Sequence, residues 1–127
     1  MIYLDTSVLL AELFVEPKHP KTELWHADTL VSSQLLEVEV WCVLYRRSRA
    51  RDYGAAAANL LDRVYLIDLT SEILGRAQQP LPLPLRALDA IHMATLAEFS
   101  GQSCMIATYD KEMAECAVAL GFPLATA

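Results

Sequence analysis

The sequence predicts an α/β fold of three layers, with helices on both faces of a central, mostly parallel sheet of four to five strands. Two observations carry this prediction. Short apolar segments of strand length alternate along the chain with longer segments of helical periodicity, which is typical of a parallel sheet. The 127 residues, 54% of them hydrophobic, suffice for one core without disulfides, so we expect a single domain over residues 1–127.

Four strands are expected where apolar, β-favouring runs end in polar residues. The first is Ile2-Tyr3-Leu4, which ends at Asp5. The others cover residues 30–33, 64–67 and 104–108, and residues 123–126 form a candidate edge strand. Ligands of open α/β sheets bind beyond the carboxyl ends of the strands. Asp5 therefore marks the edge of the sheet at which a site is expected.

Helices are expected between these strands, with boundaries set by capping residues and glycines. Their predicted ranges are 7–13, 21–28, 34–47, 51–62, 71–78, 85–100 and 109–120, with a turn over 16–20. Thr70 is the expected N-cap of the helix over 71–78. Pro80, Pro82 and Pro84 alternate with leucines. They predict an extended connector held against the surface, because proline removes backbone donors and fixes φ.

The composition limits the classes of function. A formal net charge of −6 gives no global attraction for nucleic acid, so a phosphate-bearing substrate would need local basic groups or bridging cations. Three cysteines without a C-x-x-C pair indicate small buried residues in a reducing compartment. No run reaches the ~18 apolar residues of a membrane span, and no basic residue precedes the apolar N-terminal run. We therefore expect a cytoplasmic protein without a membrane partner.

Four acidic residues lie at positions that solubility alone does not explain. Asp5 ends the first strand, and Asp110 follows the fourth strand and opens a helix. Glu39 falls inside the apolar stripe of its helix, and Asp89 lies at the edge of such a stripe. Each position alone also suits a structural role. These roles are an arginine-paired buried glutamate for Glu39 and a helix cap or first-turn acid for Asp89 and Asp110.

Together the four acids predict a metal site. In a doubly wound sheet they can converge on one crevice, where four carboxylates cannot all stay ionised without cations. Hard oxygen ligands favour Mg²⁺ or Mn²⁺, and such a site suits phosphodiester hydrolysis. Thr6 and Thr108 can offer hydroxyls to a metal or its waters, or can act as caps. His92 lies three residues after Asp89, but we interpret it as a hydrogen-bonded core residue outside the site.

Four sequence blocks resemble the PIN domain and, more narrowly, the VapC-type toxins of bacterial type II toxin–antitoxin pairs. The blocks are Leu4-Asp5-Thr6-Ser7, Ser32-Ser33-x-Leu35-Leu36-x-x-Glu39-Val40, Leu88-Asp89-Ala90-Ile91-His92-Met93-Ala94 and Thr108-Tyr109-Asp110. They occur in the family's order over the whole chain. The resemblance implies an Mg²⁺- or Mn²⁺-dependent endoribonuclease that forms a homodimer and is inhibited by a cognate antitoxin. The residues that it assigns to the catalytic, metal-binding set are Asp5, Glu39, Asp89 and Asp110, with Thr6 and Thr108 as helpers.

One dense basic run follows the helix that carries Glu39. It consists of Arg46, Arg47, Arg49 and Arg51. Arginine forks match phosphate geometry, which makes this run a candidate RNA contact. A solvated helix end favoured by the helix dipole is the alternative.

Other functions fit the residues less well. A non-catalytic PIN-like module that binds RNA or protein is the main alternative, and its mark would be loss of one or more of the four acids. A phosphohydrolase of the haloacid dehalogenase kind needs an acid two residues after its nucleophilic aspartate, where this chain has Ser7. A receiver domain would need an acidic pair near the first strand, which this chain lacks.

Overall fold

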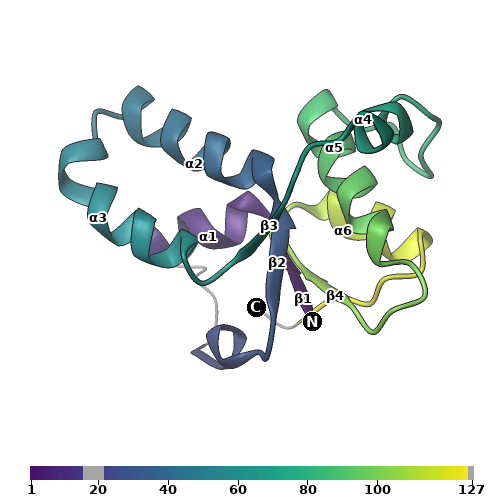
Figure 1. Ribbon diagram of the computed structural model, residues 1–127, viewed down its shortest axis with the longest axis horizontal. Helices are drawn as coiled ribbons and strands as arrows, with labels where there is room; N and C mark the ends of the chain where they lie inside the picture. The colour runs from purple at the N-terminus through teal and green to yellow at the C-terminus, as the bar shows by residue number, and fades with distance from the viewer. Residues whose placement is uncertain (16–21, 126–127) are drawn as a thin grey trace.

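The structure is a computed structural model of the chain that describes residues 1–15 and 22–125. Four parallel strands form one sheet in the order β3-β2-β1-β4 (Figure 1). The strands are β1 (Ile2–Leu4), β2 (Leu30–Ser33), β3 (Tyr65–Ile67) and β4 (Met105–Ala107). An isolated parallel bridge joins Ile106 to Leu124. The predicted parallel sheet of four to five strands is therefore confirmed.

Helices cover both faces of this sheet, as the sequence predicted. They are α1 (Thr6–Leu13), α2 (Gln34–Arg46), α3 (Ala50–Leu61), α4 (Ser71–Ala77), α5 (Ala87–Leu96) and α6 (Lys111–Ala119), with short 3₁₀ helices η1 (Thr22–His26) and η2 (Ala97–Phe99). In Figure 1, α1, α2 and α3 lie on one side of the strands and α4, α5 and α6 on the other, which gives three layers. No helix within residues 1–15 and 22–125 has the length and apolar character to cross a membrane.

The alternation of side chains along β1 divides the interior into two cores. Ile2 and Leu4 belong to the core shared with α1, α2 and α3. Tyr3 points to the other face and joins the core formed with α5 and α6. Successive residues of a strand face opposite sides of the sheet. A strand that is buried on both faces therefore has a continuous apolar sequence. Tyr3 and Leu4 are both fully buried.

The order of the strands places a topological switch point beside β1. β2 and β3 follow on one side of β1, whereas β4 lies on its other side. The direction of winding therefore reverses between β1 and β4, which is the point where doubly wound sheets bind ligands. The backbone N–H of Asp5 donates to the Ala107 carbonyl at 3.0 Å, so the carboxyl ends of these two strands are tied together at this point.

Some predicted boundaries and environments differ from the structure. The helix expected from residue 85 begins at Ala87, because the extended connector continues to Leu85, whose side chain packs on the second core together with Leu81 and Leu83. Of the cysteines predicted to be buried, Cys42 is exposed. The turn predicted over 16–20 lies outside the described residues.

Candidate active site

Asp5 is held by hydroxyl groups at the turn between β1 and α1. It is the N-cap of α1, and its side chain is almost completely buried. Its Oδ2 accepts hydrogen bonds from Ser7 Oγ at 2.6 Å and from Thr108 Oγ1 at 2.9 Å. Hydrogen bonds of this kind stabilise a carboxylate where water is excluded. Asp5 therefore has one fixed orientation at the switch point of the sheet.

Thr108 joins Asp5 to Asp110. Its hydroxyl donates to Asp5 and accepts from the backbone N–H of Asp110 at 3.0 Å. Asp110 is the N-cap of α6, and its Oδ1 accepts from the Met113 N–H at 2.9 Å. Asp110 is thus a helix cap, which is one of the structural roles considered for it from the sequence. The two turns that follow β1 and β4 are connected through one threonine.

Glu39 is half-buried on α2 and is held by two groups from other helices. Its Oε1 accepts from Thr6 Oγ1 at 2.8 Å and lies 2.6 Å from His92 Nε2. Glu39 is therefore paired with a histidine and a threonine, whereas the structural role considered from the sequence would have paired it with an arginine. Thr6 lies in the first turn of α1, so Thr6 also brings Glu39 towards Asp5.

His92 is a fully buried residue of α5, as predicted. Its Nδ1 lies 2.8 Å from the hydroxyl of Tyr3, and its other nitrogen contacts Glu39. Burial raises the pKa of Tyr3, so the phenol keeps its proton. The sequence analysis placed His92 outside the site, because the position of a lone histidine on an apolar face does not reveal a hydrogen-bond partner that is distant in the sequence.

Asp89 lies half-buried in the first turn of α5. Burial is the main cause that raises its pKa, and the negative charges of Asp110, Asp5 and Glu39 raise it further, against the opposing effect of His92. These three charges belong to the other acids of the predicted set. The structure therefore brings the other three acids of the set within electrostatic reach of Asp89.

A pocket of about 410 Å³ adjoins this group of acids. Its lining consists of Arg86, Asp89, Asp110, Lys111 and Glu112. Arg86 and Lys111 were not assigned to the site from the sequence. In the sequence, the only sign of a role in the site is their distance from the acids. Arg86 lies three residues before Asp89, and Lys111 lies one residue after Asp110. They supply positive charge beside two candidate metal ligands in an acidic protein.

The donor set fits a hard divalent cation. Four carboxylates are the ligands that Mg²⁺ and Mn²⁺ prefer. Burial and the charges of the other three acids raise the pKa of Asp89, and a cation would relieve the repulsion between these charges. Among residues 1–15 and 22–125, however, no three His, Cys, Asp or Glu side chains are arranged closely enough to hold a metal ion. The acids are gathered but do not form a closed metal cage.

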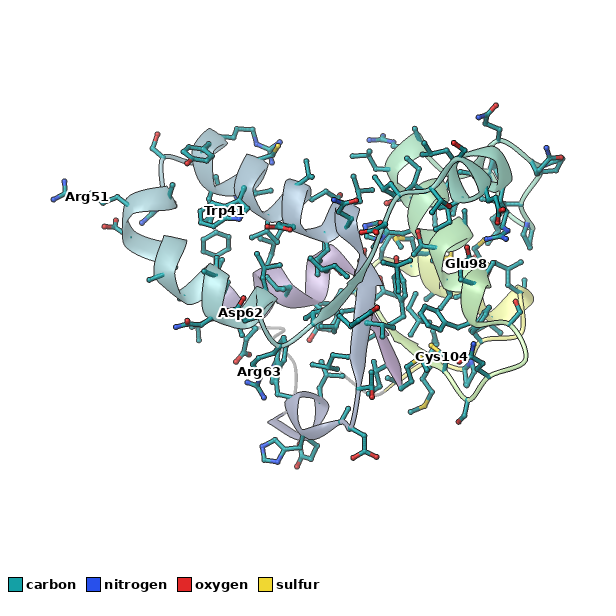
Figure 2. The ribbon with its side chains drawn as sticks, in the orientation of Figure 1. Trp41, Arg51, Asp62, Arg63, Glu98 and Cys104 are labelled. Atoms are coloured by element: carbon teal, nitrogen blue, oxygen red, sulfur yellow. The ribbon has the colours of Figure 1, made fainter. Side chains whose placement is uncertain are left out.

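The structure does not bring the basic run to the acids. Arg46, Arg47, Arg49 and Arg51 are all exposed, at the corner between α2 and α3. Two of them lie over aromatic rings, Arg47 at 5.1 Å from the Phe14 ring and Arg49 at 6.0 Å from the Tyr53 ring. In Figure 2, Arg51 marks the end of the molecule opposite to α5 and α6.

Comparisons with known proteins agree on one family. The PIN domain model matches residues 2–119. Ribonuclease VapC47 of Mycobacterium tuberculosis is 31% identical to this chain over 132 residues, which cover 99% of this chain and 96% of that protein. Ribonuclease VapC46 of the same species is 34% identical over 94% of this chain and 92% of its own length.

Solved structures show the same fold. The crystal structure of Mycobacterium tuberculosis VapC20, a sarcin-ricin loop cleaving toxin, matches with a TM-score of 0.71 at 23% identity over 100% of both chains. A toxin–antitoxin complex from Klebsiella pneumoniae matches with a TM-score of 0.55 at 20% identity, over 90% of this chain and 91% of that one.

Proposed function

This chain belongs to the PIN domain family and, within it, to the VapC ribonucleases, and from that premise we propose that it is a metal-dependent endoribonuclease, the toxin of a toxin–antitoxin pair. The observation that carries the proposal is the environment of Asp89, whose pKa is raised by burial and, further, by the charges of Asp110, Asp5 and Glu39. Such a cluster is costly in a folded protein unless a cation binds it.

The proposal gives each acid a role in holding Mg²⁺ or Mn²⁺. The assigned ligands are Asp5, Glu39, Asp89 and Asp110. When bound, the cation would activate the attacking water and neutralise charge on the phosphodiester. The neighbouring hydroxyls orient the acids, with Ser7 and Thr108 on Asp5 and Thr6 on Glu39. Ligands fixed in this way lose little freedom when a cation binds.

The RNA phosphates need positive charge close to the acids. Arg86 and Lys111 line the pocket that contains Asp89 and Asp110, so we assign them to the phosphates next to the scissile bond. The exposed run from Arg46 to Arg51 lies at the other end of the molecule (Figure 2). We assign it to a more distant part of a long RNA.

A cognate antitoxin is the proposed protein partner. The solved neighbour from Klebsiella pneumoniae is itself a toxin–antitoxin complex. A group of acids around Asp89, whose pKa is raised by burial and by the charges of the other three, would accept an arginine from such a partner in place of a cation. Binding of the antitoxin would then compete with binding of the metal.

A second copy of this chain is the other proposed partner, and α2 offers a surface for it. Val38, Cys42 and Tyr45 form an exposed stripe on α2 with the i, i+4, i+7 spacing of one helix face. Glu37 lies in the first turn of α2 and Arg46 in the last. An antiparallel two-fold arrangement would place opposite charges at both ends of the paired stripes.

The homodimer can be tested through Cys42, because the other two cysteines are buried. A short bismaleimide should link two chains of the wild type, and Val38→Glu should abolish both the cross-link and the dimer mass in light scattering. A wild-type chain that runs as a monomer would remove the homodimer from the proposal.

RNA cleavage tests the proposed activity. A structured RNA pool is incubated with the wild type in Mg²⁺, in Mn²⁺ and in chelator, beside Asp5→Asn and Asp89→Asn. We expect cleavage only by the wild type with a divalent cation. Cleavage by both variants at the wild-type rate would indicate contamination. RNA binding without cleavage would favour the alternative of a non-catalytic binding module.

A further inference from the structure

A chain of hydrogen bonds runs from the second core to Glu39. The hydroxyl of Tyr3 lies 2.8 Å from His92 Nδ1, and His92 Nε2 lies 2.6 Å from Glu39 Oε1. Tyr3 and His92 have no exposed surface, and the Glu39 side chain retains only 21% of its exposed area. Tyr3 and His92 therefore interact away from water, where hydrogen bonds are stronger and fix the relative positions of their groups more firmly.

The carboxylate of Glu39 decides the direction of these bonds. Carboxylate oxygens accept hydrogen bonds and have no hydrogen to donate. The hydrogen between His92 and Glu39 therefore belongs to His92 Nε2. In a neutral imidazole Nδ1 then carries no hydrogen, so Nδ1 accepts the hydrogen of the Tyr3 hydroxyl.

The hydrogen on His92 Nε2 points at Glu39 Oε1. Thr6 Oγ1 donates to the same carboxylate oxygen, Oε1, at 2.8 Å. Among the described residues, the hydrogen bonds that Glu39 accepts all end on Oε1. Its second oxygen, Oε2, is left for a different ligand.

We propose that Tyr3 and His92 are positioning residues, which hold the Glu39 carboxylate by Oε1 so that Oε2 stays available to a divalent cation. This inference rests on the proposed function, in which Glu39 is a metal ligand. Groups that hold a metal ligand in this way typically contribute about 10- to 100-fold to metal affinity or activity. Tyr3 contacts His92, and His92 contacts Glu39. Removal of the Tyr3 hydroxyl from the core should therefore weaken metal binding at the site.

The test compares Mn²⁺ binding, measured by calorimetry, with RNA cleavage in four variants. Tyr3→Phe removes only the hydroxyl, and His92→Leu removes both ring nitrogens. His92→Gln restores an N–H donor near the position of Nε2. Cys116→Ala is the control, because Cys116 is fully buried in the same core as Tyr3 but takes part in neither of the two hydrogen bonds of the chain.

We expect Tyr3→Phe and His92→Leu to bind Mn²⁺ about 10- to 100-fold more weakly and to lower kcat with an unchanged KM for RNA. His92→Gln should recover most of the affinity, and Cys116→Ala should keep all of it. Wild-type affinity in Tyr3→Phe, or an equal loss in Cys116→Ala, would overturn the inference. If His92→Leu does not fold, Tyr3→Phe alone decides.

A second readout needs neither metal nor activity. Nitrogen-15 NMR of the metal-free wild type should show His92 with a protonated Nε2 and an unprotonated Nδ1. The reverse tautomer, or two protonated nitrogens, would overturn the inference even if the enzyme cleaves RNA. A wild type that has the expected tautomer but binds no Mn²⁺ would instead overturn the proposed function, and with it the role of Glu39 as a ligand.

Discussion

Thr108→Val should destabilise the protein more than its half-buried position suggests. The hydroxyl of Thr108 donates to the Asp5 carboxylate at 2.9 Å and accepts from the Asp110 N–H at 3.0 Å. A hydrogen bond to a charged group contributes about 1.5–3 kcal/mol and a neutral one about 0.5–1.5 kcal/mol. Valine keeps the shape and removes both bonds. We therefore expect a loss of about 2–4 kcal/mol, which is a large part of the roughly 5–15 kcal/mol that stabilises a typical domain.

Urea unfolding in chelator measures this loss directly. The fluorescence of Trp25 and Trp41 reports the transition, and the midpoint should fall while the slope stays constant. Thermal unfolding should agree, with a decrease in Tm of roughly 8 °C or more at about 4 °C per kcal/mol for a domain of this size.

Thr95→Val is the control, since the Thr95 hydroxyl donates to the Ile91 carbonyl inside α5 and, among the described residues, to no charged group. That substitution should cost less than about 1 kcal/mol. If Thr108→Val were no more destabilising than Thr95→Val, the idea that Thr108 ties the two turns together would be refuted.

Three further predictions concern charge. Because the pKa of Asp89 is raised in the fold, its ionised form destabilises the metal-free protein. Asp89→Asn should therefore have a higher Tm than the wild type at pH 7, and the difference should vanish below about pH 4, where the carboxyl is protonated in both states; equal Tm values at pH 7 would contradict this. Mn²⁺ at about 100 times the wild-type Kd should stabilise the wild type by roughly 2.7 kcal/mol, and it should stabilise Asp89→Asn, which we expect to bind at least about tenfold more weakly, by no more than about 1.4 kcal/mol, as differential scanning fluorimetry can show. Replacing Arg86 and Lys111 by alanine should weaken RNA binding and reduce the slope of log K against log salt by about 0.7 for each lost phosphate contact, measured by fluorescence anisotropy. The pair Arg49→Ala and Arg51→Ala serves as the comparison, and a larger effect of that pair would move the main RNA contact to the corner between α2 and α3.

The sequence predicted the fold and the family well because the relevant signals are local. Asp5, Ser33, Thr70 and Asp110 each end an extended segment, and the structure has each of them as the N-cap of a helix. Four short blocks were enough to indicate the PIN domain and the VapC group. The family match over residues 2–119 and the two mycobacterial relatives confirm that prediction.

The contacts that orient the acids could not be predicted in the same way. Glu39 and His92 are 53 residues apart, and helical periodicity says only that each faces inward. Their pairing depends on how α2 and α5 pack at the end of the sheet. Arg86 likewise lies beside Asp110 and Lys111 in one pocket, which forms only when the start of α5 meets the start of α6.

Mn²⁺ binding by the single acid variants tests the central claim most directly. Calorimetry would compare the wild type with Asp5→Asn, Glu39→Gln, Asp89→Asn and Asp110→Asn, and with Glu72→Gln on α4 as the control. If the four acids form one site, each of the four variants should bind Mn²⁺ at least about tenfold more weakly, and the control should bind like the wild type. Wild-type affinity in all four variants would contradict the assignment of these acids to a metal site.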